Sequence, residues 1–157
     1  MSADLLKNNL MHSRAAYHHA VAALPLEEKL QTGTIRQYGF EFSRSDQITS
    51  QVIELGWAFF PRYEGCLEKW LKDQSVKLNR KVSLKVWLEN NNVEIPDKYL
   101  GALESYRKIR NSLHHDDGAS FDSSLGTEIH LMPTDMERFF DLFCWIGEQV
   151  EAVNVLR

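Results

Sequence analysis

Apolar residues recur every three or four positions through most of the chain, the spacing that gathers them on one side of an α-helix. This spacing predicts a first helix from about Asp4 to Leu24, which Pro25 ends. It predicts a long second helix that starts near Ser45 or Asp46 and runs to about Asp73, with Pro61 inside it. A proline in a helix interior removes a backbone donor, so Pro61 is expected to bend or split this helix.

The second half of the chain carries three further helix signals. Ser83 is a candidate cap for a short helix from Leu84 to Glu89. Pro96, at a first-turn position, opens the helix that carries Arg110 and the residues that follow it. Thr134 with Glu137 three residues later predicts a capping box for the last helix.

Short alternating patterns are the only indication of β-structure. They occur near residues 35–42 and 127–132, where at most short strand pieces are expected, and the first of the two is either a short strand or an ordered loop. The predicted fold is therefore all-α, a bundle of four to five helices. A length of 157 residues fits one domain, so residues 1–157 are taken as a single helical domain.

Composition and charge narrow the class of protein. No segment has the pattern of a signal peptide or of a membrane-spanning helix, so a cytoplasmic protein without a membrane contact is expected. Cys66 and Cys144 lie in apolar helical patterns and are expected to be buried free thiols. The formal net charge of -4 argues against coating nucleic acid through bulk charge. The basic stretch 77–85 is either a solvated face or a local contact for phosphate.

Arg110 occupies an unexpected place on its helix. With Tyr106 at the centre of the apolar stripe and a step of about 100° per residue, Arg110 falls at about 40°, inside the stripe. A guanidinium keeps its charge, so burial there requires a partner acid such as Glu64, an escape to solvent, or a bound ligand such as phosphate. The residues that define the stripe are Tyr99, Leu103, Tyr106, Ile109 and Leu113.

Two histidines follow Arg110. In a regular helix His114 lies at about 80°, on the same edge as Arg110, and His115 at about 180°. The acids at 116 and 117 and Gly118 indicate that the helix ends here, so either imidazole can approach the guanidinium. A metal site is not expected, because four consecutive residues cannot easily converge on one ion. The residues that invite a metal site are His114, His115, Asp116, Asp117 and His130.

The run Arg110, Asn111, Ser112, Leu113, His114 and His115, at the end of a helix in a small all-helical protein, resembles the R-x4-6-H motif of the HEPN superfamily. HEPN stands for higher eukaryotes and prokaryotes nucleotide-binding domain. The resemblance covers roughly residues 45–155 and makes residues 1–44 an N-terminal helical extension. It implies a homodimer in which two motifs meet at one cleft, with no cofactor and no metal. It also implies RNA as substrate and a setting in bacterial toxin-antitoxin or antiviral defence systems, with an antitoxin or a defence-system protein as partner.

The resemblance also assigns roles to residues. Arg110 would hold the scissile phosphate, and the family spacing selects His115 as general acid and base, with His114 as the alternative histidine. Asn111 would orient the arginine, the histidine or a phosphate. Glu64, on the long helix, is the candidate for the acid that some members place beside the pair. Arg107 and Lys108 are the candidates for RNA-backbone contacts.

Two other functions remain open on the sequence. Some family members lack catalysis, so the chain could instead be a catalytically inactive HEPN-like module that binds a protein partner or a nucleotide. A third hypothesis gives Arg110 a structural role alone. It predicts that Arg110→Ala loses stability and affects no ligand.

Overall fold

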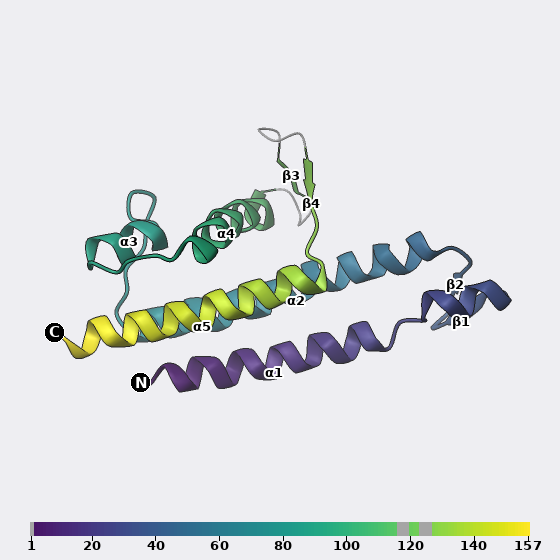
Figure 1. Cartoon of the computed structure of the whole chain (residues 1–157), viewed down its shortest axis with the longest axis horizontal. Coiled ribbons are helices and arrows are strands. Elements are labelled where there is room, and N and C mark those ends of the chain that lie inside the picture. Colours follow the sequence, from purple (N-terminus) through teal and green to yellow (C-terminus); the bar gives the residue numbers. More distant parts are fainter. Residues whose placement is uncertain (1, 116–119, 123–126) are drawn as a thin grey trace.

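The structure, a computed structural model, describes the backbone of residues 2–115, 120–122 and 127–157 and the side chains of residues 2–111 and 130–157. Within these residues the chain forms five α-helices, a short 3-10 helix and two antiparallel hairpins (Figure 1). The elements are α1 (Ala3–Ala22), η1 (Glu27–Thr32), β1 (Ile35–Gln37), β2 (Phe40–Phe42), α2 (Ser45–Asp73), α3 (Leu84–Asn90), α4 (Asp97–His115), β3 (Ser120–Asp122), β4 (Thr127–Ile129) and α5 (Pro133–Val155). The all-α prediction is confirmed, with strand pieces at both predicted places. One strand, β3, lies outside these places, in a segment that was expected to be a loop.

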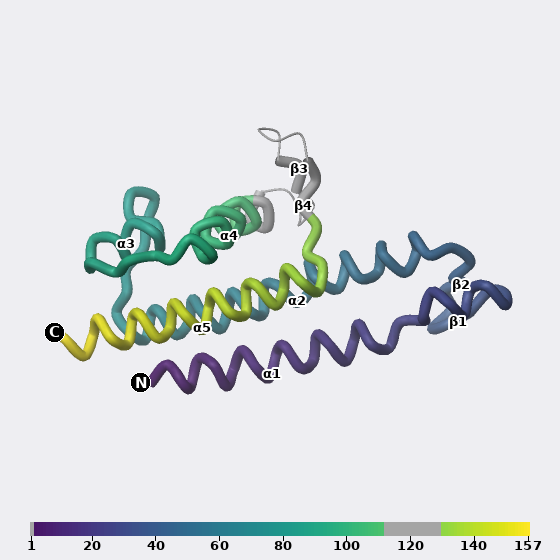
Figure 2. Tube along the Cα trace, in the orientation of Figure 1, coloured from purple at the N-terminus to yellow at the C-terminus, as the bar shows by residue number. Residues whose placement is uncertain are grey.

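Three long helices form the body of the molecule. α1, α2 and α5 pack against one another, and α4 packs on α5. The trace in Figure 2 shows that α1 runs opposite to α2 and α5, and that both ends of the chain lie at one end of the bundle. α3 and α4 lie together on the side of the body away from α1 (Figure 1). The surface that carries Arg110 is thus formed by the second half of the chain laid over α2 and α5.

An aromatic cluster joins α4 to this body. Phe60 of α2 meets Phe139 of α5 edge to face at 5.1 Å, and Tyr106 of α4 meets Phe143 of α5 in the same way at 5.2 Å. The rings of Phe60 and Tyr106 lie 6.1 Å apart. All four side chains are buried, and such ring pairs favour these tilted geometries. Tyr106 thereby fixes the rotation of α4 one turn before Arg110.

The predicted helix limits agree closely with the structure at most positions. α2 spans Ser45–Asp73 and continues through Pro61 without a break, so the proline does not split it. The Ser83 hydroxyl accepts a hydrogen bond from the Val86 N–H and caps α3, as predicted. The first helix ends at Ala22, two residues before the predicted end.

The predicted capping box of the last helix is wrong. α5 begins at Pro133, one residue before Thr134, because proline is well suited to a first helical position. The carboxylate of Asp135 accepts the hydrogen bond of the Met132 N–H at 3.0 Å, which is the contact expected of Glu137. Glu137 instead accepts two hydrogen bonds from Arg14 of α1, at 2.8 Å and 2.7 Å.

Two further sequence expectations concern thiols and membranes. Cys66 and Cys144 are free and half-buried. Within the part of the chain that the structure describes, none of the helices combines the length and the apolar character needed to cross a bilayer.

Candidate functional site

Arg110 lies at the edge of the apolar stripe of α4. Its neighbour Ile109 is fully buried, whereas 41% of the Arg110 side chain remains exposed. The backbone of α4 is held against the body through Tyr106, so the long arginine side chain can reach solvent while its helix position stays on the core side. The sequence left three alternatives for Arg110: a partner acid, an escape to solvent, or a bound ligand. In the structure Arg110 both contacts acids and reaches solvent.

Two acids of α2 engage the guanidinium. Nε of Arg110 lies 3.5 Å from Oε1 of Glu64, and Nη2 lies 2.8 Å from Oε1 of Glu68. The Glu64 side chain is buried, with 8% exposed, and the Glu68 side chain is 37% exposed. Glu64 and Glu68 are four residues apart and therefore lie one helical turn apart on the same side of α2. Arg110 thus has the acidic partner, Glu64, that is required if its role is only structural. In this pair only the Glu64 side chain is buried, and the Arg110 side chain stays partly exposed.

The environment of Glu64 makes its carboxyl group hard to ionise. Burial and, to a lesser extent, the neighbouring Glu68 carboxylate raise the pKa of Glu64, and Arg110 acts in the opposite direction. Together they place the pKa of Glu64 at about 7. Near neutral pH the two acids therefore carry less than two negative charges between them. This shared charge can balance Arg110 but leaves little surplus to neutralise other cations nearby.

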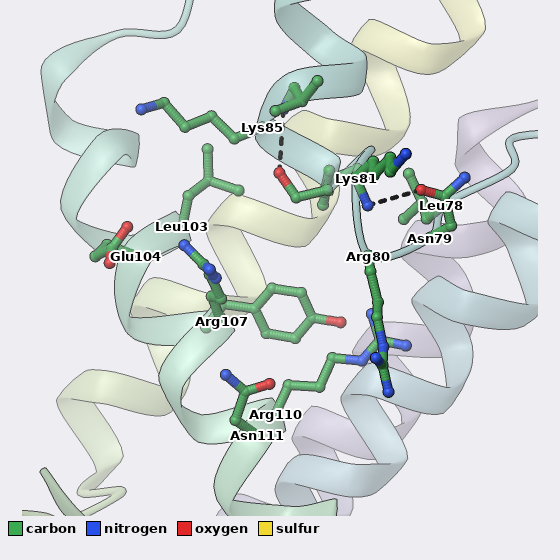
Figure 3. Close-up of a pocket in the computed structure, with 14 residues that line it drawn as sticks. Leu78, Asn79, Arg80, Lys81, Lys85, Leu103, Glu104, Arg107, Arg110 and Asn111 are labelled. Atoms are coloured by element: carbon green, nitrogen blue, oxygen red, sulfur yellow. Dashed lines mark hydrogen bonds between the residues drawn. The ribbon is translucent and has the colours of Figure 1, made fainter.

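A cavity of about 620 Å³ opens beside Arg110. One wall is α4, which contributes Arg107, Arg110 and Asn111, and the opposite wall is the segment 78–86 that leads into and forms the start of α3. In Figure 3 the Arg110 side chain extends from α4 toward the side of the cavity on which Arg80 lies. The basic stretch 77–85 and the motif helix thus meet at one cavity.

The segment before α3 is held by local hydrogen bonds. α2 ends in a Schellman turn, in which Ser75 takes a left-handed φ of 61° and the Val76 N–H bonds to the Leu71 carbonyl at 3.0 Å. Val76 is buried, which anchors the chain as it leaves the helix. The Asn79 side chain then accepts hydrogen bonds from the N–H groups of Lys81 and Val82 at 2.8 Å and 2.9 Å. Figure 3 shows the first of these.

These contacts leave the charged side chains of the segment on the outside. Arg80, Lys81 and Lys85 are exposed, and all three line the cavity. Among the residues with described side chains, Arg80, Lys81 and Arg107 make no ion pair, while Lys85 lies 3.9 Å from Glu89.

The cavity concentrates positive charge in an acidic protein. Its described lining contains five cations, Arg80, Lys81, Lys85, Arg107 and Arg110, and one acid, Glu104. The chain as a whole has a formal net charge of -4. Low overall charge and a local cationic cavity are compatible, because a cleft with charge of one sign raises the local concentration of an oppositely charged ligand. The arrangement is suited to binding phosphate groups.

The predicted site residues are only partly brought together. The cavity lining includes Arg107, Arg110 and Asn111. Glu64 is not part of this lining and contacts Arg110 from α2. Lys108 is half-buried and is not part of the described lining.

The histidines of the motif lie at the end of α4, whose helical backbone continues through His115. In a helix that continues through residue 115, residues four apart lie on the same side, so His114 is favoured as the neighbour of Arg110. The side chains of His114 and His115 lie outside the described residues, so the choice between them stays a prediction. The expected helix end at residues 116–118 also lies outside them.

No metal cluster is present among the described residues, in which no three His, Cys, Asp or Glu side chains converge. His130 is exposed at the surface, and residues 114–117 of the same candidate set fall outside the described side chains.

Sequence reasoning missed Glu68, the acid with the shortest contact to Arg110. The signal was present, because Glu64 and Glu68 have the spacing that places two side chains on one helix face. The sequence does not show that this face of α2 is turned toward α4, because that depends on how the two helices pack.

Comparison with known proteins adds no relative. No protein-family model matches the chain, and no curated protein or solved structure matches it. The resemblance to the HEPN superfamily therefore rests on the motif at residues 110–115 and on the order of the helices around it.

Proposed function

We propose that the chain is a metal-independent endoribonuclease of the HEPN type. The observation that supports this most is the position of Arg110, whose half-exposed guanidinium lines a cationic cavity next to Asn111. A purely structural arginine needs its acidic partners, but it needs neither an opening to solvent nor unpaired cations around that opening. A ribonuclease needs both, because the scissile phosphate must reach the arginine.

In the proposed reaction the ribose 2'-oxygen attacks the adjacent phosphorus. A bond forms between the 2'-oxygen and phosphorus, and the bond from phosphorus to the 5'-oxygen of the next nucleotide breaks. His115, or His114 in its place, carries out one of the two proton transfers, from the 2'-hydroxyl or to the leaving 5'-oxygen, and water carries out the other. Arg110 binds the phosphate through two N–H groups as its negative charge increases. The products are a 2',3'-cyclic phosphate and a free 5'-hydroxyl, and DNA is excluded as substrate.

The proposal includes the biological setting that the resemblance implies. The enzyme would act in the cytoplasm as a homodimer, in a bacterial toxin-antitoxin or antiviral defence system, with RNA as substrate and an antitoxin or another defence protein as partner. Arg107 and Lys108 would contact the RNA backbone beside the cut phosphate.

The test is RNA cleavage by purified protein and by Arg110→Ala, His115→Ala and His114→Ala variants. We expect Arg110→Ala and one of the two histidine variants to reduce the rate at least about a hundredfold. Arg62→Ala serves as the control, because Arg62 is an exposed cation of α2 outside the cavity lining. Equal cleavage by all variants would contradict the proposal, and so would cleavage that a chelator abolishes.

Loss of activity in Arg110→Ala has a second explanation, because the variant leaves Glu64 buried without its cation. The double variant Glu64→Gln with Arg110→Ala removes that unpaired charge and should recover stability. If Arg110 has a catalytic role, the double variant stays inactive although it is folded. If its role is only structural, activity returns with stability.

A catalytically inactive module is the second candidate, and the two acidic contacts of Arg110 favour it. In the free chain Glu64 and Glu68 already occupy the guanidinium, which would be sufficient reason for the arginine in a protein that only binds a partner or a nucleotide. This candidate predicts no cleavage of any RNA, together with a stable complex between the chain and the product of a neighbouring gene.

A further inference from the structure

The cavity beside Arg110 is not cationic throughout. Apolar side chains from both walls form part of its lining, and the charged groups come from positions around them. Leu84, Leu103 and Tyr106 are buried, and Leu78 and Val86 are half-buried. The three buried residues also belong to the hydrophobic core, so the apolar surface open to a ligand comes mainly from Leu78 and Val86. Phosphate alone would make no use of that surface, since it is bound by charge and hydrogen bonds. The lining therefore indicates a ligand that is anionic at one end and apolar at the other.

We infer that this cavity binds one nucleotide unit, with its base inside against the apolar lining and its phosphate at the cations of the opening. The inference rests on the proposed function in taking RNA as the source of the nucleotide. It adds a subsite formed by the segment 78–86, which lies outside the R-x4-6-H motif. The same chemistry also fits a free nucleoside monophosphate, which the experiment below distinguishes from a strand.

The size of the cavity agrees with such a ligand. At about 620 Å³ it lies within the range of roughly 300 to 1,000 Å³ that is typical of small-molecule sites. A base that is paired and stacked in a duplex cannot enter a cavity, so the subsite requires an unpaired nucleotide. The expected substrate is thus single-stranded at the cleavage position.

The polar groups of the cavity are arranged for the two ends of a nucleotide. Arg80 and Lys81 are exposed on the segment before α3 and have no ion pair among the described residues, so both can bind a phosphate. Asn111 is exposed on α4 and lies beside Arg110 in Figure 3. Its amide offers both a donor and an acceptor, which is what an edge of a base requires. By contrast, the Asn79 oxygen is already used within its own turn.

The experiment measures equilibrium binding, so it does not depend on catalysis. The probe is a short single-stranded RNA with 2'-fluoro sugars, which lack the hydroxyl that would attack the phosphate. Its comparison is an abasic strand with the same number of phosphates. We expect the intact strand to bind at least about tenfold more tightly than the abasic strand.

Two variants assign this difference to the cavity. Val86→Trp fills the cavity from α3 and should remove the preference for the intact strand over the abasic strand. Leu78→Trp fills it from the preceding segment and replaces Val86→Trp if thermal unfolding shows that variant to be misfolded. Arg80→Ala with Lys81→Ala should weaken both strands alike, and Lys69→Ala, an exposed cation outside the lining, should weaken neither.

Equal binding of intact and abasic strands by the unmodified protein would overturn the inference, as would a base preference that both cavity-filling variants retain. Binding of adenosine or uridine monophosphate alone with the same dependence on Val86 would support the subsite and identify free nucleotide as the ligand. The two proposals fail separately. A chain that shows the base preference but cleaves no RNA retains the subsite and loses the nuclease, and a chain that cleaves RNA without a base preference retains only the nuclease.

Discussion

Nη2 of Arg110 lies 2.8 Å from the carboxylate of Glu68, and both residues line a second, smaller cavity of about 190 Å³. Glu68 is 37% exposed, whereas only 8% of the Glu64 side chain is exposed. A phosphate that binds Arg110 must compete with this acid for the same N–H groups. Glu68 is thus expected to lower the affinity of the site for anions in the free protein.

The first prediction is that Glu68→Gln increases the affinity for RNA. Removal of one negative charge a few ångströms from the bound phosphate is worth about 1 kcal/mol in a partly solvated site, which corresponds to about fivefold in the dissociation constant. The change in stability should stay below about 1 kcal/mol, because the pair is partly exposed. The measurement is a fluorescence titration with 2'-fluoro RNA at low and at high salt.

Glu54→Gln is the matched control for this prediction, because Glu54 is an exposed acid of the same helix outside both cavity linings. It removes the same charge from the chain, so any effect of net charge appears in both variants. An equal gain in affinity for the two variants would show that Glu68 has no local role at Arg110.

The second prediction concerns Glu64 and pH. Burial raises the pKa of Glu64 to about 7 from an ordinary value of 4.5. The folded chain therefore holds this proton more tightly than the unfolded chain, and the free energy of unfolding falls as the pH rises from about 4.5 to about 7. The loss should be on the order of 2 kcal/mol across that window.

Glu64→Gln isolates this contribution, because glutamine has the shape of the protonated acid and does not titrate. The measurement is urea unfolding of both proteins at several pH values between about 4.5 and 7. The free energy of unfolding of the native chain, relative to the variant, should be highest at the acid end and fall toward neutral pH. A difference that stays constant with pH would show that the Glu64 pKa is not raised by folding.

Helix positions were predictable because they depend on spacing within one segment. The stripe of α2 from Ser45 to Asp73 and the Ser83 cap of α3 are each encoded in adjacent residues. The spacing also predicted that Arg110 lies on the apolar side of its helix. An arginine there needs an acid, solvent or a ligand to balance its charge. Glu64 could be named as a candidate because it is an acid on a long neighbouring helix.

The remaining features depend on contacts between segments. Glu137 has the spacing of a capping residue, but it pairs with Arg14, which is 123 residues away in the chain. The positive charge of the stretch 77–85 could be read from the sequence. Its position next to α4 could not. Its approach to Arg107 and Arg110 follows from the turn after α2 and from the way α4 is seated through Tyr106.

The third prediction tests the contact between α1 and α5 at Glu137. Its carboxylate accepts hydrogen bonds from Nε and Nη2 of Arg14, and these hydrogen bonds are the main reason that the pKa of Glu137 is lowered. Arg14 also lies over the ring of Phe140, 4.6 Å from its centre. Glu137→Gln should therefore lower the free energy of unfolding by about 1 kcal/mol at neutral pH, a value that allows for solvent screening of a partly exposed pair.

The pH dependence of this contact has the opposite sign from that of Glu64. Because folding lowers the pKa of Glu137, its contribution is complete above about pH 4.5 and is lost as the pH falls through the lowered value. Thermal unfolding at neutral and at acid pH should show the deficit of Glu137→Gln at neutral pH alone. Glu148→Gln, an exposed acid of the same helix, is the control and should cost almost nothing. A deficit of equal size in acid would show that Glu137 acts through shape and not through charge.

The fourth prediction comes from two glycines of α2 with opposite surroundings. A Cβ added to Gly56 would lie 2.0 Å from the backbone oxygen of Leu131 and 2.7 Å from its Cβ. Leu131 is fully buried in the segment that connects β4 to α5, so neither backbone can move without opening the core. A Cβ added to Gly65 would meet no atom within 4 Å.

Gly56→Ala should therefore lower the free energy of unfolding by about 3 kcal/mol, because the methyl group forces α2 away from the start of α5. Gly65→Ala should instead raise it by about 1 kcal/mol, since alanine is the better helix former and nothing opposes its side chain. The same substitution in the same helix thus has opposite signs, which urea unfolding of the two variants can measure directly. If Gly56→Ala also stabilised the chain, Leu131 could not lie against α2 at this position, and the path of the chain from β4 into α5 would have to differ from the one described.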